Sequence, residues 1–358
     1  MAHIVMHHAT SPVAGIAHGR GPPHRQESPM TTTLPKTAEV LPLIADAVTA
    51  PSMHNAQPWK FVHHPESGIV ALYGDPARAM AHADPDHRAL HLGCAAALFN
   101  LRVSAARAGW EPAVRLLPDG DDPWFLAEVH LRRPEVTDPA LAALHPALRR
   151  RHSSRFPFSE EEIPPALLDG LRSAALLEGC RLAVPDAWHA ETVLGLVHDS
   201  EHREEMDPTL RAETKSWTHA GTTDQQVRPD GIPAYAFGPK QSGRGALVRD
   251  FGRSEPVPGR GWAVFERRPH LALLGTSGDT PADWLRAGQA LERVLLQATA
   301  DGLVTSMTSQ PLEWPELRWT VRDPGASMSH VQMVIRLGYG PEGPATPRRP
   351  VADVLDIR

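Results

Sequence analysis

The sequence has 358 residues, enough for two average domains or one large core, and its 41% hydrophobic and 22% charged residues are typical of a soluble globular protein. No run approaches the roughly 18 apolar residues of a membrane span. The net charge of -6 gives no basic footprint, which argues against nucleic-acid binding. Cys94 and Cys180 lie far apart outside any C-x-x-C pattern, so we expect a reducing, cytoplasmic setting, with neither a nucleic-acid nor a membrane partner.

Residues 1–33 are predicted to be a disordered leader. They contain many histidines, glycines and prolines but lack the continuous apolar region of a signal peptide. Met30 opens the run in which regular patterning begins, so Met1 and Met30 both remain candidate start residues.

The first part of the chain alternates helical and extended patterns. Apolar residues recur at helical spacing over 37–48, and this helix should end before Pro51, because the residue preceding a proline avoids the αR region. Gly109 is placed to end a long second helix. The remaining predictions are strands at 59–62 and 68–73, a helix over 86–108, strands at 113–117 and 124–131, and a helix over 139–148.

The second part repeats this rhythm after an irregular connection. The segment 207–261 is rich in Gly, Pro, Gln and Ser with poor periodicity, and a connection of that length is usually a functional cover or a disordered insert. Around it we predict helices over 164–177, 187–204 and 282–300 and extended segments at 180–184, 269–276, 303–307 and 330–339. The first long helix ends at Ala-Gly-Trp (108–110) and the second at Ala-Asp-Gly (300–302), and this shared rhythm favours two related α+β halves.

Four short motifs carry the candidate chemistry. PSMHNAQPWKF at 51–61 holds a hydroxyl, a histidine and two amides between two prolines. RHSSR at 151–155 offers guanidinium forks with interleaved hydroxyls, which suit a phosphate dianion, although an isolated arginine run is otherwise a solvated turn. GLVTSMTS at 302–309 brings backbone N–H groups and small hydroxyls close to the core, and the tail at 346–355 adds two arginines.

Other features favour plainer interpretations. Trp59 and Phe61 alternate on a strand and are predicted to pack in the core. The histidines and aspartates between 82 and 91 lack a third ligand at fixed spacing, so no metal site is predicted. GPKQSGRG at 238–245 lacks the Lys-Ser/Thr pair of a phosphate loop, and no G-x-G-x-x-G follows a strand.

Taken together, PSxHNxQPWxF, RHSSRxxF, AxGLxTS and the terminal LGYG and RRP resemble the FMN-dependent nitroreductase family, and their order and the chain length resemble its Acg-type branch. The resemblance covers about residues 35–355 and implies an α+β nitroreductase-like fold in which two halves form an intramolecular pseudo-dimer. The first half would span 34–145. The second would span 146–358, with a lid at about 207–261.

The order of the motifs implies the stoichiometry. In ordinary nitroreductases the basic motif precedes the amide motif, and each flavin lies between two subunits; here the amide motif comes first. One site can then receive its amides from the first half and its arginines from the second, while the companion site lacks both. The resemblance therefore implies one FMN per chain in a monomer.

The resemblance also implies roles for individual residues. Arg151, Ser153 and Arg349, with Arg348 beside them, would hold the ribityl phosphate, and Arg155 would lie near the N1/O2 edge. The residues expected along the isoalloxazine ring or the ribityl chain are Ser52, Asn55, Gln57, Thr305, Ser306 and Met307. His54 either caps its turn or contacts the flavin. The glutamate-glycine pair often found beside N5 is replaced by Ser306 and Met307.

The implied function is an FMN-binding oxidoreductase. NAD(P)H would bind transiently and reduce the flavin, which would then reduce an electron-poor small-molecule acceptor by hydride transfer. One alternative is an Acg-type protein whose 207–261 lid closes over FMN, so that it stores or sequesters flavin with little or no reductase activity. A third class is a flavin-free interaction protein. The catalytic residues, the acceptor and the choice between NADH and NADPH stay unassigned.

Overall fold

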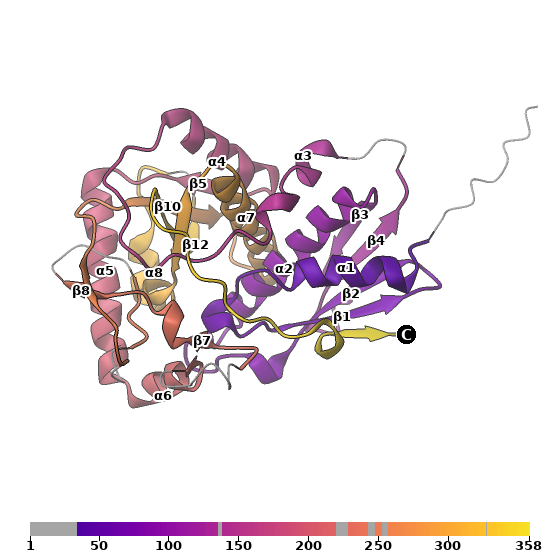
Figure 1. The fold of residues 1–358 in the computed structure, drawn as a ribbon, viewed down its shortest axis with the longest axis horizontal. Coiled ribbons are helices and arrows are strands. Elements are labelled where there is room, and N and C mark those ends of the chain that lie inside the picture. The colour runs from indigo at the N-terminus through magenta and orange to yellow at the C-terminus, as the bar shows by residue number, and fades with distance from the viewer. Residues whose placement is uncertain (1–33, 135–137, 220–227, 243–247, 253–256, 327) are drawn as a thin grey trace, which may run out of the picture. The chain divides into compact units, whose positions relative to one another are not determined.

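A computed structural model describes residues 34–134, 138–219, 228–242, 248–252, 257–326 and 328–358, all within one compact unit. The leader predicted at 1–33 lies outside these ranges. Two β-sheets, each covered by a long helix, account for most of the core (Figure 1).

The first sheet has the order β13-β1-β2-β4-β3. Its four longer strands run antiparallel and match the sequence prediction within a few residues: β1 is Trp59–His64, β2 Ile69–Gly74, β3 Glu111–Leu116 and β4 Phe125–Arg132. The fifth strand, β13 (Leu355–Ile357), was not predicted. It pairs in parallel with β1, placing Leu355 opposite Phe61, and lies beside β1 at the yellow end of the chain in Figure 1.

The second sheet has the order β11-β12-β10-β5 and is antiparallel throughout. Its strands are β5 (Arg181–Ala183), β10 (His270–Thr276), β11 (Val304–Thr308) and β12 (His330–Gly338), as predicted from the sequence. β11 lies at one edge, and on its outer side the Ser154 N–H donates to the Thr305 carbonyl at 2.8 Å. The RHSSR segment is thereby attached to the edge of this sheet.

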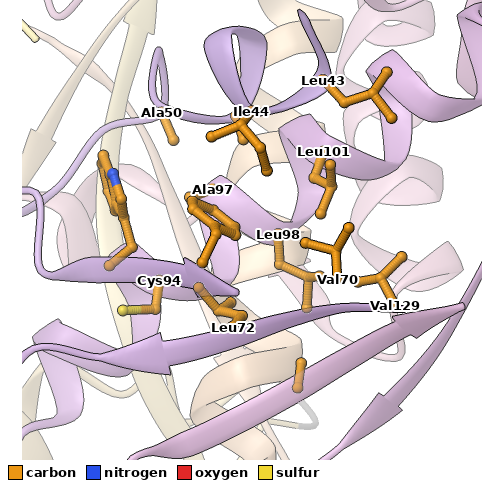
Figure 2. Packing of buried hydrophobic residues seen from close by; sticks show 14 of the residues in the cluster. Leu43, Ile44, Ala50, Val70, Leu72, Cys94, Ala97, Leu98, Leu101 and Val129 are labelled. Atoms are coloured by element: carbon orange, nitrogen blue, oxygen red, sulfur yellow. The ribbon is translucent and has the colours of Figure 1, made fainter. Parts of the chain in front are cut away.

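Two long helices join the sheets. α2 (Arg88–Arg107) packs on the first sheet with α1 (Thr37–Ala47), and α7 (Pro281–Ala300) packs on the second with α4 (Pro165–Leu177). Figure 2 shows small and branched side chains of α2 and α1 packed over the first sheet. Trp59 and Phe61 are buried there, as predicted. α2 is long and apolar enough to cross a membrane, but 94% of that window is buried inside the protein.

α2 and α7 pack directly against each other, side by side at the centre of the fold (Figure 1). Gly288 of α7 makes this approach possible: a Cβ atom there would lie 2.3 Å from the Leu92 carbonyl oxygen and 2.6 Å from the Ala95 Cβ. The two helices therefore meet backbone to backbone, and the segments at the N-terminal end of α2 come close to the second sheet.

Three predictions of secondary structure were wrong in detail. The helix expected over 139–148 is a short α3 (Pro139–Ala142) followed by a 3-10 turn, η3 (His145–Ala147), because Pro146 has no N–H to continue the helical bonds. The segment expected to be irregular from 207 begins with α6 (Pro208–Ser216), and Asp207 caps it by accepting from the N–H groups of Thr209 and Leu210. The helix α8 (Pro315–Val321) was not predicted.

The remainder of the 207–261 segment forms one small parallel pair within itself and a second with the residues that follow it. β6 (Thr218–His219) pairs with β7 (Ile232–Pro233), and β8 (Lys240–Ser242) pairs with β9 (Trp262–Val264). α5 (Ala187–Met206) leads into the segment. One 3-10 turn, η5 (Ala234–Ala236), lies within it, and another, η7 (Val351–Asp353), lies near the end of the chain. This arrangement lays the segment over one side of the pocket described next.

Candidate functional site

A pocket with an empty volume of about 1170 Å³, counting the space at its mouth, lies where six parts of the chain converge. Its wall is formed mainly by residues 51–55, 88–93, 151–155, 248–251, 306–310 and 344–348. Nine of the twelve residues predicted from the sequence line it: Ser52, His54, Asn55, Arg151, Ser153, Arg155, Ser306, Met307 and Arg348. The structure therefore brings together motifs that are far apart in the chain, such as those around Ser52, Arg151 and Ser306.

The amide motif forms a tight turn with unusual backbone angles. His54, Asn55 and Gln57 have φ values of 47°, 55° and 53°, a left-handed conformation that is uncommon outside glycine but tolerated by asparagine and histidine. The Ser52 hydroxyl accepts from the Gln57 N–H at 2.9 Å and stabilises this turn. The Asn55 amide donates to the carbonyls of Gly231 and Pro347 at 3.0 and 3.1 Å, so the turn fastens two distant segments beside the pocket.

Gln57 and Arg349 do not line the pocket. The Gln57 side chain is fully buried, donates to the Pro229 carbonyl at 2.7 Å and accepts from the Arg349 N–H at 2.7 Å. The Arg349 guanidinium donates to the carbonyls of Gln57 and Asp353 at 3.2 and 2.9 Å. Both side chains hold the C-terminal segment against the amide turn, which differs from the contact with a ligand predicted for them.

Two guanidinium groups form one end of the pocket. Arg151 is 2% exposed, and its Nη2 donates to the Thr49 carbonyl at 3.2 Å. Arg348 Nη2 donates to the same carbonyl at 3.1 Å. Burial, followed by the charge of Arg151, lowers the pKa of Arg348 to about 9, so Arg348 remains cationic at neutral pH. Ser153 also lines the pocket, and guanidinium groups together with a hydroxyl are donors that fit a phosphate dianion.

The pKa of His152 reflects the positive charge at this end of the pocket. Burial, then the charges of Arg151 and Arg348, lowers the pKa of His152 to about 4. Its imidazole is therefore neutral at pH 7 and adds no charge of its own. An anion bound here would meet two guanidinium groups and a neutral ring.

A third arginine lies elsewhere in the pocket wall. Arg155 Nη1 donates to the Ala236 carbonyl at 2.9 Å, and the guanidinium carbon lies 5.0 Å from the centroid of the Phe251 ring. Burial, then the charge of Arg249, lowers the pKa of Arg155 to about 10. Within the described ranges no carboxylate forms an ion pair with it, so a buried positive charge is available to a ligand.

Arg249 and Phe251 close one side of the pocket, and sequence reasoning missed both. Arg249 donates to Glu204 at 2.7 Å, to Glu313 at 3.2 Å and to the Nε2 of His54 at 3.0 Å. The Phe251 ring meets the His54 ring edge to face, with centroids 5.3 Å apart. These partners lie at least 45 residues away in sequence, so no local pattern could have indicated them.

His54 is held neutral by this arrangement. Burial is the main cause that lowers its pKa well below the usual value, followed by the charges of Arg249 and Arg155. Because Nε2 accepts from Arg249, the ring proton belongs on Nδ1, which has no hydrogen-bond partner among the described residues. Among the described residues the ring makes no hydrogen bond that caps its turn, since Nε2 contacts Arg249 and Nδ1 has no partner. His54 does line the pocket, and its contact with flavin stays a prediction.

The edge strand β11 supplies the opposite wall. Ser306 and Met307 line the pocket, whereas Thr305 does not and instead forms a backbone bridge with Ser153. Gln310, which follows the strand, is 2% exposed, and neither its amide nitrogen nor its amide oxygen has a partner among the described residues. A cationic end, a polar edge and unsatisfied buried amide and imidazole groups are the donor set expected of a site for a phosphorylated heteroaromatic ligand.

Comparison with known proteins gives the family. The profile described as "Nitroreductase family" matches residues 148–339, more than half of the chain. "Putative NAD(P)H nitroreductase Rv3131" from Mycobacterium tuberculosis H37Rv is 31% identical over 94% of this chain and 95% of its own. "Putative NAD(P)H nitroreductase acg" from the same strain is 29% identical over 92% of this chain and 98% of its own.

A solved structure with the same family name was also found. The FMN-dependent nitroreductase NfnB from Mycobacterium smegmatis, solved in complex with NADPH, is 14% identical, with a TM-score of 0.36 over 60% of this chain and 97% of that chain. The family profile and the two relatives, which match over almost their whole lengths, confirm the resemblance identified in the sequence. This chain belongs to the nitroreductase family, in its Acg-type branch.

Proposed function

We propose that this protein is an FMN-dependent NAD(P)H oxidoreductase that reduces an electron-poor small molecule. The observation that carries the proposal is the pocket itself, whose wall includes the buried guanidinium of Arg151 and the half-buried arginines Arg348 and Arg155. Family membership and the NAD(P)H nitroreductase names of the relatives support it.

Arg151, Arg348 and Ser153 would hold the FMN phosphate, because they form the cationic end of the pocket. Gln57 and Arg349 would then contribute indirectly, because their hydrogen bonds keep the 346–349 segment in place. Bound FMN would supply a carrier that accepts a hydride from NAD(P)H and passes it to the acceptor.

The remaining pocket residues would shape the environment of the ring. Arg155 places a buried positive charge where a flavin could be stabilised as it gains negative charge. Phe251 and the surrounding 248–251 segment would exclude water from one face. Ser306 and Met307, on the edge strand, would present the backbone along the ring.

The test is a visible spectrum followed by anaerobic reduction. Apoprotein reconstituted with FMN should retain the flavin band after gel filtration, and NADPH or NADH added without oxygen should bleach it. Re-oxidation by a nitroaromatic acceptor would then complete the cycle. A colourless protein after reconstitution would favour the flavin-free class and contradict the proposal.

A second candidate, a closed flavin store, has one observation in its favour. The 248–251 segment is held over the pocket by Arg249, whose ion pairs reach α5 through Glu204 and the turn after β11 through Glu313. If the flavin band persisted when NADPH and NADH were added, storage would replace reduction as the proposed function.

We also propose that residues 34–145 and 146–358 are related halves that bind one FMN in a monomeric chain. Each range contributes one long central helix and most of one sheet, which supports the proposal. The two ranges are also connected through β13, which belongs to the second range but pairs with β1 in the sheet of the first.

A further inference from the structure

Glu292 is a fully buried carboxylate directly behind the cationic end of the pocket. It lies in the middle of α7, is 0% exposed and does not line the pocket. Its Oε1 lies 3.5 Å from Arg151 Nε, which is an ion pair but too long for a good hydrogen bond. Among the described residues, neither carboxylate oxygen of Glu292 has a hydrogen-bond partner. The same holds for Arg151 Nε.

The groups that face Glu292 come from three other parts of the chain. Arg151 approaches from the RHSSR segment, Arg348 from the C-terminal segment and Asn100 from α2. Asn100 Nδ2 donates one N–H to the Thr49 hydroxyl, and its second N–H can face Glu292, whose ionised form Asn100 favours. Burial raises the pKa of Glu292 to about 7, and the three neighbours only partly oppose this rise. The carboxyl group is therefore divided between its neutral and ionised forms near neutral pH.

One titratable anion thus lies beside two cations, the buried Arg151 and the half-buried Arg348, which also line the pocket. When Glu292 is ionised, it neutralises part of the positive charge of Arg151 and Arg348. A phosphate dianion bound by the same two guanidiniums would neutralise their charge in place of Glu292. It would also repel the ionised carboxylate. Protonation of Glu292 removes the repulsion at the cost of a single proton.

We propose that Glu292 is a positioning residue that replaces the ligand phosphate as the counter-charge of Arg151 and Arg348 in the empty protein, and that it takes up a proton when the phosphate binds. The inference rests on the proposed FMN site. It adds a regulatory property, because the affinity for a phosphorylated ligand becomes dependent on pH through a residue that the ligand does not touch.

The direction of the pH dependence follows from the linkage. Binding raises the pKa of Glu292 above its value of about 7 in the free protein, so the protonated form binds better and affinity falls as pH rises from 7. We expect the affinity for FMN to fall by about four- to tenfold between pH 7 and 8.5. The phosphate itself is already a dianion throughout this range, since its second pKa is about 6.

Calorimetric titration of FMN into apoprotein at pH 7.5 measures the proton directly. Titrations in PIPES, HEPES and Tris, whose ionisation enthalpies differ, should show net uptake of roughly half a proton. Riboflavin, which lacks the phosphate, should bind without this uptake. His152 should stay neutral at this pH because its pKa is about 4, so it should contribute little.

Two matched variants identify the group that takes up the proton. Glu292→Gln keeps the shape but cannot titrate, so FMN should bind it without proton uptake and with an affinity that no longer falls from pH 7 to 8.5. Glu178→Gln is the control. Glu178 is another buried carboxylate, paired with Arg102 on α2 and Arg293 on α7 but absent from the pocket wall, and this variant should retain the uptake.

The outcomes separate this inference from the proposed function. Equal proton uptake with FMN and riboflavin, or unchanged uptake in Glu292→Gln, would overturn the role of Glu292 while leaving the FMN site standing. Absence of FMN binding to the wild-type apoprotein would overturn both. Because the FMN and riboflavin titrations use the wild-type chain, the inference remains testable even if Glu292→Gln does not fold.

Discussion

The three consecutive arginines Arg149, Arg150 and Arg151 differ in exposure and in their partners. Arg149 and Arg150 are exposed and pair with Asp46 and Glu342, which is the solvated role expected of an arginine run. Arg151 alone turns inward and is 2% exposed. The sequence indicated the function of the run, but only packing distinguishes the one buried arginine from the two exposed ones.

Arg151→Ala should weaken FMN binding by about ten- to a hundredfold, because a charge-assisted hydrogen bond contributes about 1.5–3 kcal/mol. Arg150→Ala, next in the chain and at the surface, should change affinity less than twofold. Fluorescence quenching of FMN on titration with apoprotein would measure both. If the two variants lost equal affinity, a general effect of positive charge would explain binding better than a phosphate contact.

His54 should make the protein sensitive to acid. Its pKa is lowered in the folded state, so the unfolded chain binds more protons below about pH 6.5, and the stability that neutral His54 contributes is lost as pH falls through that value. His54→Gln keeps an acceptor for Arg249 but cannot be protonated. Urea unfolding at pH 7.5 and 5.5 should show that the wild type loses more stability than this variant, and an equal loss would contradict the assignment.

At the scale of elements, the pocket depends on how closely α2 and α7 approach. Gly93 of α2 adjoins Ser52, since a Cβ atom there would lie 3.1 Å from the Ser52 Cβ, and Gly288 of α7 adjoins the backbone of α2. These two contacts link the amide turn, α2 and α7. A change at the helix crossing should therefore be felt in the pocket as well as in stability.

Gly288→Ala should destabilise the protein by about 3 kcal/mol, because the new methyl group would meet the Leu92 carbonyl oxygen at 2.3 Å and a backbone atom cannot rotate away. Gly170→Ala and Gly195→Ala serve as controls within helices α4 and α5. An added Cβ meets nothing within 4 Å at either site, so each change should stabilise by about 0.5–1 kcal/mol. Urea denaturation of the three variants would test this, and similar losses in all of them would refute the close-crossing argument.

The elements that could be predicted from the sequence were those with their own periodicity. The apolar stripes of α2 and α7 and the alternation of Trp59 and Phe61 in β1 met this condition. β13 has only three residues and becomes a strand because β1 offers it an edge. Similarly, the motifs at 51–61 and 151–155 indicated the site, whereas Arg249 and Glu292 acquire their roles only through partners elsewhere in the chain.

At the scale of the whole molecule, the pocket takes its walls from both proposed halves of one chain. Residues 51–55 and 88–93 come from the first, and residues 151–155 and 306–310 come from the second. A companion site would need a second amide turn and a second arginine motif, and the sequence repeats neither. The proposed fusion would therefore leave one such site per chain.

Reconstituted protein should contain one FMN per chain and behave as a monomer of 39.0 kDa. Flavin absorbance after release from a known amount of protein would give the stoichiometry, and light scattering during gel filtration would give the mass. Two flavins per chain would reveal a second site, and a particle of twice the mass would contradict the proposal that fusion replaces dimerisation.

The contacts of the C-terminal segment also bear on how the protein can be made. Gln57 receives the backbone of Arg349 across 292 residues, and β1 gains β13 as a neighbour only from still later in the chain. Until the C-terminal segment has been synthesised, the β1 edge of the first sheet therefore stays unpaired. The amide turn likewise lacks its hydrogen bond from Arg349. Such an edge can pair with another nascent chain, so slow synthesis or premature termination exposes this protein to aggregation before it has a pocket to fill.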